Sequence, residues 1–249
     1  MSLLNLLLHN QGKGRPIGGT KSYQQKVLAL APIAYWKFAD GVGTTNPIDS
    51  SGNGYTATNS NFVFGSLGIG DGSTSAYNAS TLTAYVDTYS AGWAAAFPGA
   101  AGSFFIWAKI KSATELTDGT QHHICRIRAD VNNVLEISKT ATNNNLNYKL
   151  TAGGAVVQVT KADYSDVSWV TMAITWTDAG DQFIAYYNGT QVGTIQTGVG
   201  TWSGALSDAS SCLLQGNKGS LTAWLGYAAH CAIFNHVLSP AQILGLSLI

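Results

Sequence analysis

Carboxylates are the residues of this sequence that could support hydrolysis. Glycoside hydrolysis takes a pair of Asp or Glu side chains, one to protonate the leaving oxygen and one to attack or to activate water. The chain has only two glutamates, Glu115 and Glu136, and neither has an acidic neighbour at strand spacing. Asp163 and Asp166 are close in sequence, but Asp163-Tyr-Ser-Asp166 is typical of a turn before a strand. The sequence therefore predicts no catalytic residues and no enzyme.

Two segments combine histidine with cysteine, and they run from His122 to Cys125 and from His230 to His236. Zinc needs four converging ligands, or three ligands and a water. Neither segment has zinc-finger spacing, so we predict no metal site here; Cys125 and Cys231 are expected in the core and the histidines at half-exposed positions. With Cys212 the cysteines number three, which indicates buried free thiols and leaves one bridge open as an alternative.

Tryptophans are the strongest remaining signal for binding. Trp93, Trp202 and Trp224 lie in or beside loops rich in Gly, Ser and Ala. An exposed loop tryptophan can stack on a sugar or anchor a protein interface. The alternative is that each one folds over the edge of the domain. The other tryptophans fall inside predicted strands and are expected in the core; they are Trp36, Trp107, Trp169 and Trp176.

The composition limits the partners of the chain. Hydrophobic residues make up 45% of it and charged residues only 10%, against about 25% charged residues in typical proteins. A neutral polar surface with Tyr and Trp suits glycans or close packing against other subunits. No basic stripe covers the body, which argues against nucleic acid. No apolar run approaches the roughly 20 residues that cross a bilayer, which argues against a membrane.

Residues 1–20 have the composition of an attachment arm. They contain a leucine cluster, a Gly-rich hinge and two cations, and no acidic residue occurs before Asp40. A peptide this short cannot bury its leucines alone, so we expect it to dock on a partner or pack back on the domain. No signal-peptide pattern is present, which indicates synthesis in the cytoplasm. The residues assigned to the arm are Leu3, Leu4, Leu6, Leu7, Leu8, Lys13 and Arg15.

The body of the chain has the pattern of an all-β protein. A short helix is predicted from Ser22 to Leu30, and a final helical turn begins at Ser239-Pro240 with serine as its N-cap. Asn188-Gly189 predicts a type I′ hairpin. We divide the chain into 1–30, the arm and short helix, and 31–249, the sandwich domain. Thirteen short strands separated by turn residues are predicted, at 33–38, 62–64, 83–87, 103–111, 122–128, 134–138, 146–150, 156–160, 169–176, 182–187, 191–195, 213–216 and 224–234.

Four blocks of sequence carry a resemblance to a known family. They run from Ala34 to Gly54, from Ser103 to Lys109, from Trp169 to Gly189 and from Gly226 to Ile243. Together they resemble the laminin-G-like, concanavalin A-like lectin/glucanase jelly-roll family over about residues 31–246. The stretch Tyr23–Trp36 also resembles the lead-in of phage-encoded members. The resemblance implies an antiparallel two-sheet jelly-roll sandwich, with short helices at the N- and C-terminal ends.

Members of this family bind glycans or proteins, and some hold calcium near a turn that Asp71-Gly-Ser73 matches. The acidic residues that often follow that turn are here Thr74 and Ser75, so Asp71 is a weak calcium candidate and no other cofactor is expected. We interpret the chain as a non-enzymatic decoration or adhesion module on a larger assembly, with a phage virion preferred. Its partners would be capsid or tail subunits, and glycans. The alternative is a free-standing, extracellular carbohydrate-binding module.

Overall fold

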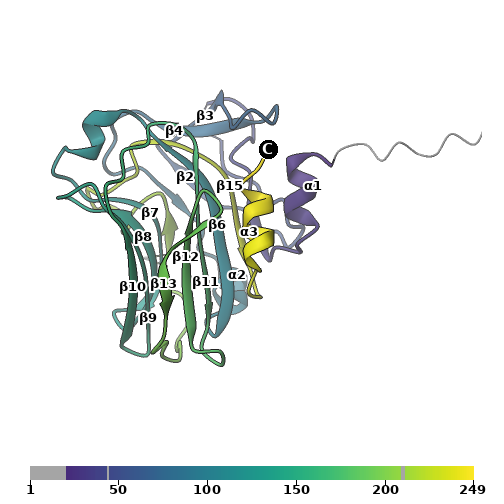
Figure 1. Cartoon of the computed structure of the whole chain (residues 1–249). Coiled ribbons are helices and arrows are strands. Elements are labelled where there is room, and N and C mark those ends of the chain that lie inside the picture. Colours follow the sequence, from purple (N-terminus) through teal and green to yellow (C-terminus); the bar gives the residue numbers. More distant parts are fainter. Residues whose placement is uncertain (1–20, 44, 209–210) are drawn as a thin grey trace, which may run out of the picture.

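The computed structural model describes residues 21–43, 45–208 and 211–249, and these form two antiparallel sheets packed face to face (Figure 1). The first sheet has eight strands in the order β13-β12-β11-β6-β15-β4-β3, with β1 paired to β15. The second has seven strands in the order β10-β9-β8-β7-β14-β5-β2. This is the jelly-roll sandwich that the sequence predicts.

The strands of the eight-stranded sheet are β1 (Ala34–Trp36), β3 (Val63–Leu67), β4 (Thr74–Asn78), β6 (Ala101–Ile110), β11 (Val170–Thr177), β12 (Gln182–Tyr187), β13 (Thr190–Gln196) and β15 (Gly226–Phe234). The strands of the seven-stranded sheet are β2 (Thr58–Ser60), β5 (Tyr85–Asp87), β7 (His122–Asp130), β8 (Asn133–Lys139), β9 (Leu146–Ala152), β10 (Ala155–Lys161) and β14 (Cys212–Leu213). The helices are α1 (Tyr23–Leu28), α2 (Ala91–Ala96), the 3-10 turn η2 (Ala113–Leu116) and α3 (Pro240–Leu246).

The main core lies between the sheets and follows from the period of the strands. In β11, Met172, Ile174 and Trp176 point into the sandwich, while Ala173 points to the outer face. Both sets are buried, because helices cover the outer face of this sheet. A strand with apolar residues on both faces is therefore central, as the sequence predicts.

Helices α1 and α3 lie side by side on the outer face of the eight-stranded sheet (Figure 1). Each begins with a serine whose side chain accepts a hydrogen bond from the backbone, Ser22 for α1 and Ser239 for α3. Tyr23 fixes α1 to the sheet, because its hydroxyl accepts a hydrogen bond from Trp107 Nε1 at 2.7 Å and donates one to the carbonyl of Leu246. Both predicted helices are confirmed.

The division of the chain at residue 30 stays a prediction. The leucines and cations of the predicted arm lie in residues 1–20, outside the described residues. Helix α1, which follows them, buries Tyr23 and Val27 against the sheet. Among the described residues, no helix is long and apolar enough to cross a bilayer.

Each predicted strand overlaps one that is observed, but β2, β4, α2 and η2 are additional. Strand β4 reads Thr-Ser-Ala-Tyr-Asn, a composition typical of a loop, and it forms because β3 and β15 pair with its two edges. The hairpin at Asn188-Gly189 is confirmed, with φ of 48° and 75°. The three cysteines are buried and free, as predicted.

Candidate functional site

Two of the three loop tryptophans proposed for binding are buried in the core. Trp93 and Trp224 are both 0% exposed. Helix α2, capped by Ser90, turns Trp93 inward, where its ring packs edge-on against Trp36. The expectation that these tryptophans contact a glycan or a partner is therefore wrong, and the alternative, a tryptophan folded into the domain, holds for both. Small loop residues leave space that a large ring fills.

Trp202 occupies an intermediate position. It is half-buried and packs on the main core, with its ring centroid 5.1 Å from that of Phe97. Gly99 lies beneath it, so closely that a Cβ there would be 2.5 Å from Trp202 Cδ1. Part of the indole remains accessible, but the ring serves mainly to close the end of the sandwich.

Trp169, which the sequence places in the core, lies partly exposed instead. It immediately precedes β11, so it emerges at the end of the strand rather than within it. Its ring centroid is 6.0 Å from that of Tyr227 on β15. Both side chains lie on the outer face of the eight-stranded sheet. Trp107 of β6 lies on the same face, where α1 packs against the sheet. Sequence reasoning missed this site because a tryptophan beside a strand looks the same whether it points in or out.

Cross-strand pairing arranges these side chains in a line, which we call the aromatic row and which consists of Trp169, Lys109, Tyr227 and Tyr77. Lys109 on β6 pairs with Tyr227, and Tyr227 pairs with Tyr77 on β4. The two tyrosine rings stack with centroids 4.3 Å apart, and the Lys109 ammonium lies 5.1 Å from the Tyr227 ring. Directly opposed side chains in a sheet contact each other, and these contacts restrict their orientations. The row is therefore a preformed surface.

A pocket of about 420 Å³ opens against the aromatic row. One wall comes from the end of β3, where Leu67 is 90% exposed. Burial raises the pKa of Tyr227, and the neighbouring Tyr77 raises it further, so the phenol keeps its proton and can both donate and accept hydrogen bonds. Ring surface beside hydroxyl and ammonium groups suits a ligand that is apolar on one side and polar at its edge. Its described lining residues are Ser66, Leu67, Gly68, Lys109, Trp169 and Tyr227.

Three histidines expected at half-exposed positions, His122, His123 and His230, are instead buried, and only His236 is half-buried as predicted. Among the described residues, no group of three or more His, Cys, Asp or Glu side chains gathers as a metal site would require. Polar partners from distant segments are what allow these histidines to be buried. His230 shows this, since Nδ1 lies 2.7 Å from the Tyr35 hydroxyl in a bulge where the φ of His230 is 50°.

The calcium candidate Asp71 is already occupied by protein groups. Its Oδ1 accepts hydrogen bonds from the backbone and the hydroxyl of Ser73, and its Oδ2 lies 3.1 Å from His230 Nε2. Burial raises the pKa of this carboxyl, but the bonds from His230 and Ser73 outweigh it and leave the pKa well below its usual value. With these donors in place, Asp71 has few free lone pairs for a cation.

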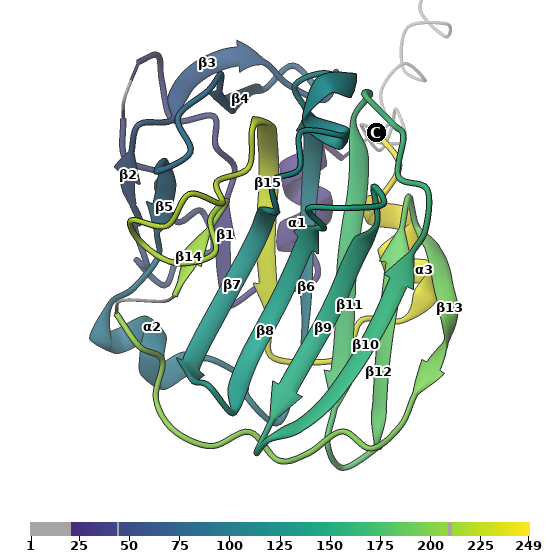
Figure 2. The ribbon, with the colours of Figure 1, turned by 90° about the vertical axis from the view of Figure 1, so that its left-hand side faces the viewer.

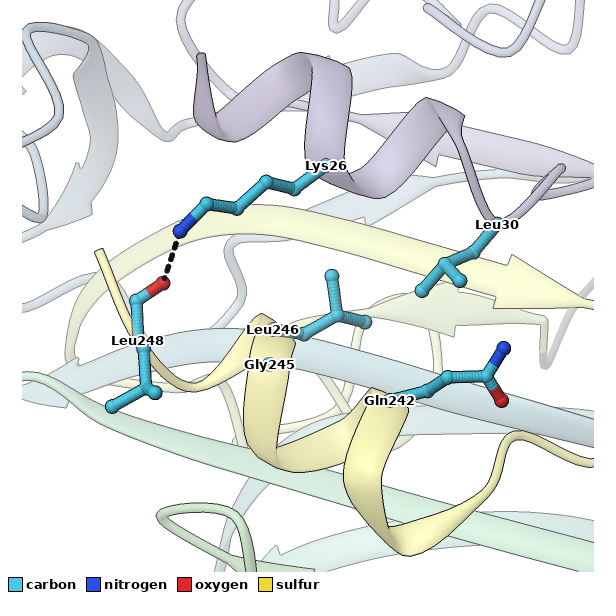
Figure 3. Close-up of a pocket in the computed structure, with 6 residues that line it drawn as sticks. All are labelled: Lys26, Leu30, Gln242, Gly245, Leu246 and Leu248. Carbon is cyan, nitrogen blue, oxygen red and sulfur yellow. Dashed lines mark hydrogen bonds between the residues drawn. The ribbon is translucent and has the colours of Figure 1, made fainter. Parts of the chain in front are cut away.

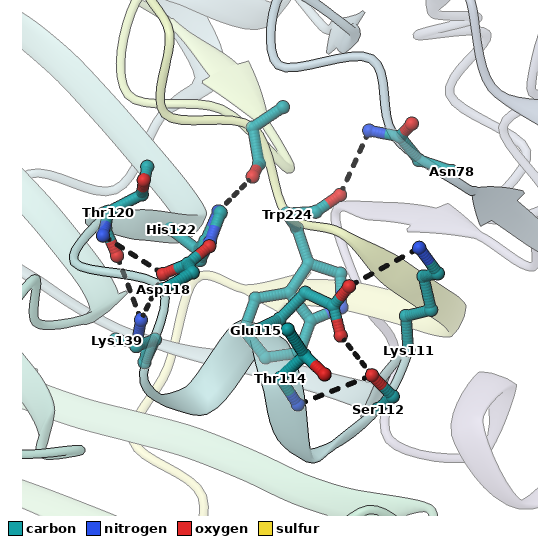
Figure 4. Close-up of polar contacts among 11 residues, drawn as sticks. Asn78, Lys111, Ser112, Thr114, Glu115, Asp118, Thr120, His122, Lys139 and Trp224 are labelled. Carbon is teal, nitrogen blue, oxygen red and sulfur yellow. Dashed lines mark hydrogen bonds and ion pairs between the residues drawn. The ribbon is translucent and has the colours of Figure 1, made fainter.

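His122 belongs to a polar cluster at the start of β7, which Figure 4 shows with Asp118 and Lys139. Its Nδ1 is 2.6 Å from the carbonyl of Ala223, and its Nε2 is 2.7 Å from Asp118 Oδ2. The buried ring therefore lies between a carbonyl oxygen and a carboxylate oxygen. The fully buried Lys139 donates to Asp118 Oδ1 at 2.9 Å. This cluster fixes the connection between η2 and the seven-stranded sheet.

A second hollow, of about 360 Å³, lies between α1 and α3 (Figure 3). It is mainly apolar, with Leu30, which follows α1, facing Leu246 of α3. The Lys26 ammonium closes one side by donating to the carbonyl of Leu248 at 3.3 Å. We call this hollow the helix groove; its described lining residues are Lys26, Leu30, Gln242, Gly245, Leu246 and Leu248.

Comparison with known proteins places the fold among lectin-like domains. The family model described as the concanavalin A-like lectin/glucanases superfamily matches residues 79–244. Domain 4 of AbnA, an extracellular arabinanase from Geobacillus stearothermophilus solved with arabinotriose, has a TM-score of 0.64 at 14% identity. That match covers 86% of this chain and 97% of the AbnA domain.

Binding domains of botulinum neurotoxins are also similar in structure. The serotype DC domain, solved with rat synaptotagmin II, has a TM-score of 0.58 at 15% identity and 89% coverage of this chain. The serotype G domain has a TM-score of 0.62 at 16% identity and 87% coverage. The chain spans about half of each toxin domain, 52% and 50%. No curated protein sequence matches this chain.

Proposed function

This chain belongs to the concanavalin A-like lectin/glucanase superfamily, and from that premise we propose that it is a non-enzymatic carbohydrate-binding module that holds its ligand against the aromatic row. The observation that carries the proposal is the pocket in which Trp169, Lys109 and Tyr227 converge. A sugar ring offers carbon-bound hydrogens on one face and hydroxyls around its edge, which matches rings beside hydroxyl and ammonium groups.

The proposal that the site binds without cleaving rests on its charges. None of the described residues that line the pocket is acidic, and glycoside hydrolysis needs two carboxylates. Elsewhere, Asp166 accepts a hydrogen bond from the Tyr187 hydroxyl, and Glu115 forms an ion pair with Lys111 at 3.3 Å. Two of the carboxylates considered from the sequence, Glu115 and Asp166, are thus tied to structural partners.

A glycan array probed with the full chain tests this function. We expect it to retain at least one class of neutral glycan and to release no new reducing ends from that glycan on long incubation. An array with no bound glycan would contradict the binding function, and turnover at a steady rate would contradict its non-enzymatic character.

A second candidate function is attachment to a larger assembly, and the helix groove is the observation that favours it. The groove presents leucine side chains beside the end of the chain, where Leu248 and Ile249 are 57% and 60% exposed. The leucine-rich residues 1–20 directly precede the helix that forms one wall. In this proposal the chain is a decoration or adhesion module, with capsid or tail subunits of a phage virion as partners, and the sandwich presents the glycan site. The alternative location is extracellular, as a free-standing module.

Deleting residues 1–20 separates attachment from folding. We expect the truncated chain to keep its melting temperature within about 2 °C, because α1 retains its own cap and its contacts with Trp107 and Leu246; a 2 °C shift corresponds to about 1 kcal/mol or less. Attachment, measured by co-sedimentation with intact virions, is expected to be lost. A truncated chain that fails to fold would assign the leucines to the domain itself and reject the arm.

A further inference from the structure

The outer face of the seven-stranded sheet lies on the side of the sandwich opposite α1 and α3 (Figure 2). This face carries a different kind of hollow. It lies over β7, β8 and β9, bordered by the loop that follows β14, and it measures about 370 Å³. We call it the His123 pocket. Its lining is almost entirely polar, in contrast to the aromatic row.

His123 is buried in this pocket with one ring nitrogen free. The residue is 4% exposed, and its Nε2 lies 3.7 Å from Glu136 Oε2. Its Nδ1 has no hydrogen-bond partner among the described residues. Protein atoms cover this nitrogen, so the imidazole forms part of the pocket wall rather than a direct contact for a ligand.

Gly216 packs directly against the edge of the imidazole that carries Nδ1. A Cβ at this position would lie 2.8 Å from both His123 Nδ1 and Cε1, closer than any side chain could sit. The glycine has ordinary backbone dihedral angles, since its φ is not in the left-handed region. The close approach to His123 and to Thr222 Oγ1, which would lie 2.6 Å from such a Cβ, is therefore what requires glycine here.

The pocket holds one more cation than carboxylate. Arg126 Nε lies 3.3 Å from Glu136 Oε2, and Arg126 Nη1 donates to Asn217 Oδ1 at 3.3 Å. Lys149 stands opposite Glu136 in the register of β8 and β9, but within 4.0 Å its ammonium has no carboxylate among the described residues. A positive charge is thus left for a ligand.

Glu136 remains charged in this setting. Burial raises the pKa of its carboxyl, but the hydrogen bond and charge of His123, with the charges of Arg126 and Lys149, outweigh burial and lower it. One carboxylate alone cannot supply an acid and a base for hydrolysis. His123 and Glu136 are also too few to bind a metal.

We propose that the His123 pocket binds the carboxylate of an acidic sugar between Lys149 and Arg126. The carboxylate would accept hydrogen bonds from the two cations, which are stronger than bonds between neutral groups. The amide and hydroxyl groups of Asn217, Ser220 and Thr222 surround this position and match sugar hydroxyls. The inference rests on the proposed glycan-binding function, and it adds a second, charge-selective site on the other face of the sandwich.

Titration of the isotopically labelled full chain with D-galacturonate, D-glucuronate and N-acetylneuraminate tests the proposal by NMR. At least one acid is expected to shift the ring signals of His123 and the side-chain signal of Arg126, with a Kd on the order of 1 mM. The methyl ester of the same sugar is expected to bind at least about fivefold more weakly, because it has lost the charge. Added salt should weaken binding of the acid but not of the ester.

The matched variants are Lys149→Gln, which removes the unpaired cation, and Lys161→Gln, which removes a lysine of β10 outside the pocket. We expect Lys149→Gln to weaken binding of the acid about fivefold or more and Lys161→Gln to leave it unchanged. Three acids that leave His123 and Arg126 unmoved at concentrations on the order of 10 mM, or an ester that binds as well as its acid, would reject the proposal.

Trp169→Ala distinguishes rejection of the acidic-sugar site from rejection of the proposed glycan-binding function. The variant should lose neutral glycans and still bind the acid in the His123 pocket. If the acidic sugars do not bind while the binding of neutral glycans still requires Trp169, only the second site is rejected. If glycans bind nowhere, the function itself is rejected.

Discussion

Replacing Trp169 by alanine is expected to weaken binding of a neutral glycan at least tenfold, the largest loss that we expect from any single change at the aromatic row. Tenfold corresponds to about 1.4 kcal/mol. Truncating a tryptophan at the centre of a binding site often costs 2 kcal/mol or more. Isothermal titration calorimetry with a glycan retained on the array measures the effect directly.

The physical reason is that Trp169 has the largest aromatic ring among the lining residues of the pocket and lies outside the core between the sheets. It precedes β11 and stays partly exposed, so its loss leaves no sealed cavity between the sheets. Tyr227 and Lys109 stabilise each other through the ring and the ammonium, and they remain upright without it. Affinity should therefore fall with little change in melting temperature.

Trp202→Phe is the matched control, because Trp202 is the half-buried loop tryptophan that the sequence nominates. We expect its affinity to stay within about a factor of two of the unmodified chain, a change of roughly 0.4 kcal/mol. If Trp202→Phe lowered the affinity for the glycan and Trp169→Ala did not, the glycan site would instead lie at the end of the sandwich near Phe97.

Replacing Asp118 by alanine is expected to lower the free energy of unfolding by about 3 kcal/mol or more, the largest single effect on stability that we predict. The change leaves Lys139, which is fully buried, without its carboxylate and leaves His122 Nε2 without an acceptor. Removing one partner of a buried ion pair costs about 3–5 kcal/mol. For a chain of this size, such a loss lowers the melting temperature by about 6–12 °C, which differential scanning calorimetry can resolve.

This stabilisation should depend on pH in a defined direction. Partial burial raises the pKa of Asp118, but the hydrogen bonds from His122, the Thr120 backbone and Lys139 outweigh it, so the pKa is lowered in the folded state. A lowered pKa stabilises the fold above the unfolded value of about 3.9, and the contribution is lost as pH falls toward the folded value. The difference between the unmodified chain and Asp118→Ala should be constant near pH 7 and shrink below about pH 4.

Two controls separate a buried pair from an ordinary surface pair. Asp208→Ala removes a carboxylate that is 68% exposed and binds Lys218 at 2.6 Å, and it should cost less than about 1 kcal/mol. Adding Lys139→Met to Asp118→Ala removes the orphaned charge and should recover part of the lost stability. If Asp118→Ala were as stable as Asp208→Ala, the buried cluster would contribute no more to the free energy of unfolding than a surface ion pair does.

The sequence was sufficient for the fold because the strands and helix ends depend on local signals. Asn188-Gly189 sets a hairpin through the φ angles that both residues tolerate, and Ser239-Pro240 begins a helix through a cap and a preset φ. Strand β4 was missed because its Thr-Ser-Ala-Tyr-Asn composition carries no such signal, and pairing on both edges creates it.

The candidate site was much less predictable, since it depends on which face each side chain takes. The sequence places Trp93 in a loop and Trp169 inside a strand, yet α2 turns Trp93 into the core and the start of β11 leaves Trp169 outside. The His123 pocket brings together residues from β7, β8, β9 and a loop nearly a hundred positions away. No spacing in the sequence indicates that meeting, because the sheet register creates it.

The most direct test of the central claim is to follow the indole N–H signals of the seven tryptophans during titration with a neutral glycan. If the aromatic row is the binding site, the Trp169 signal shifts with the glycan concentration, while those of the buried Trp93 and Trp224 stay in place. A bound glycan that shifts the Trp202 signal and leaves Trp169 unmoved would contradict the account.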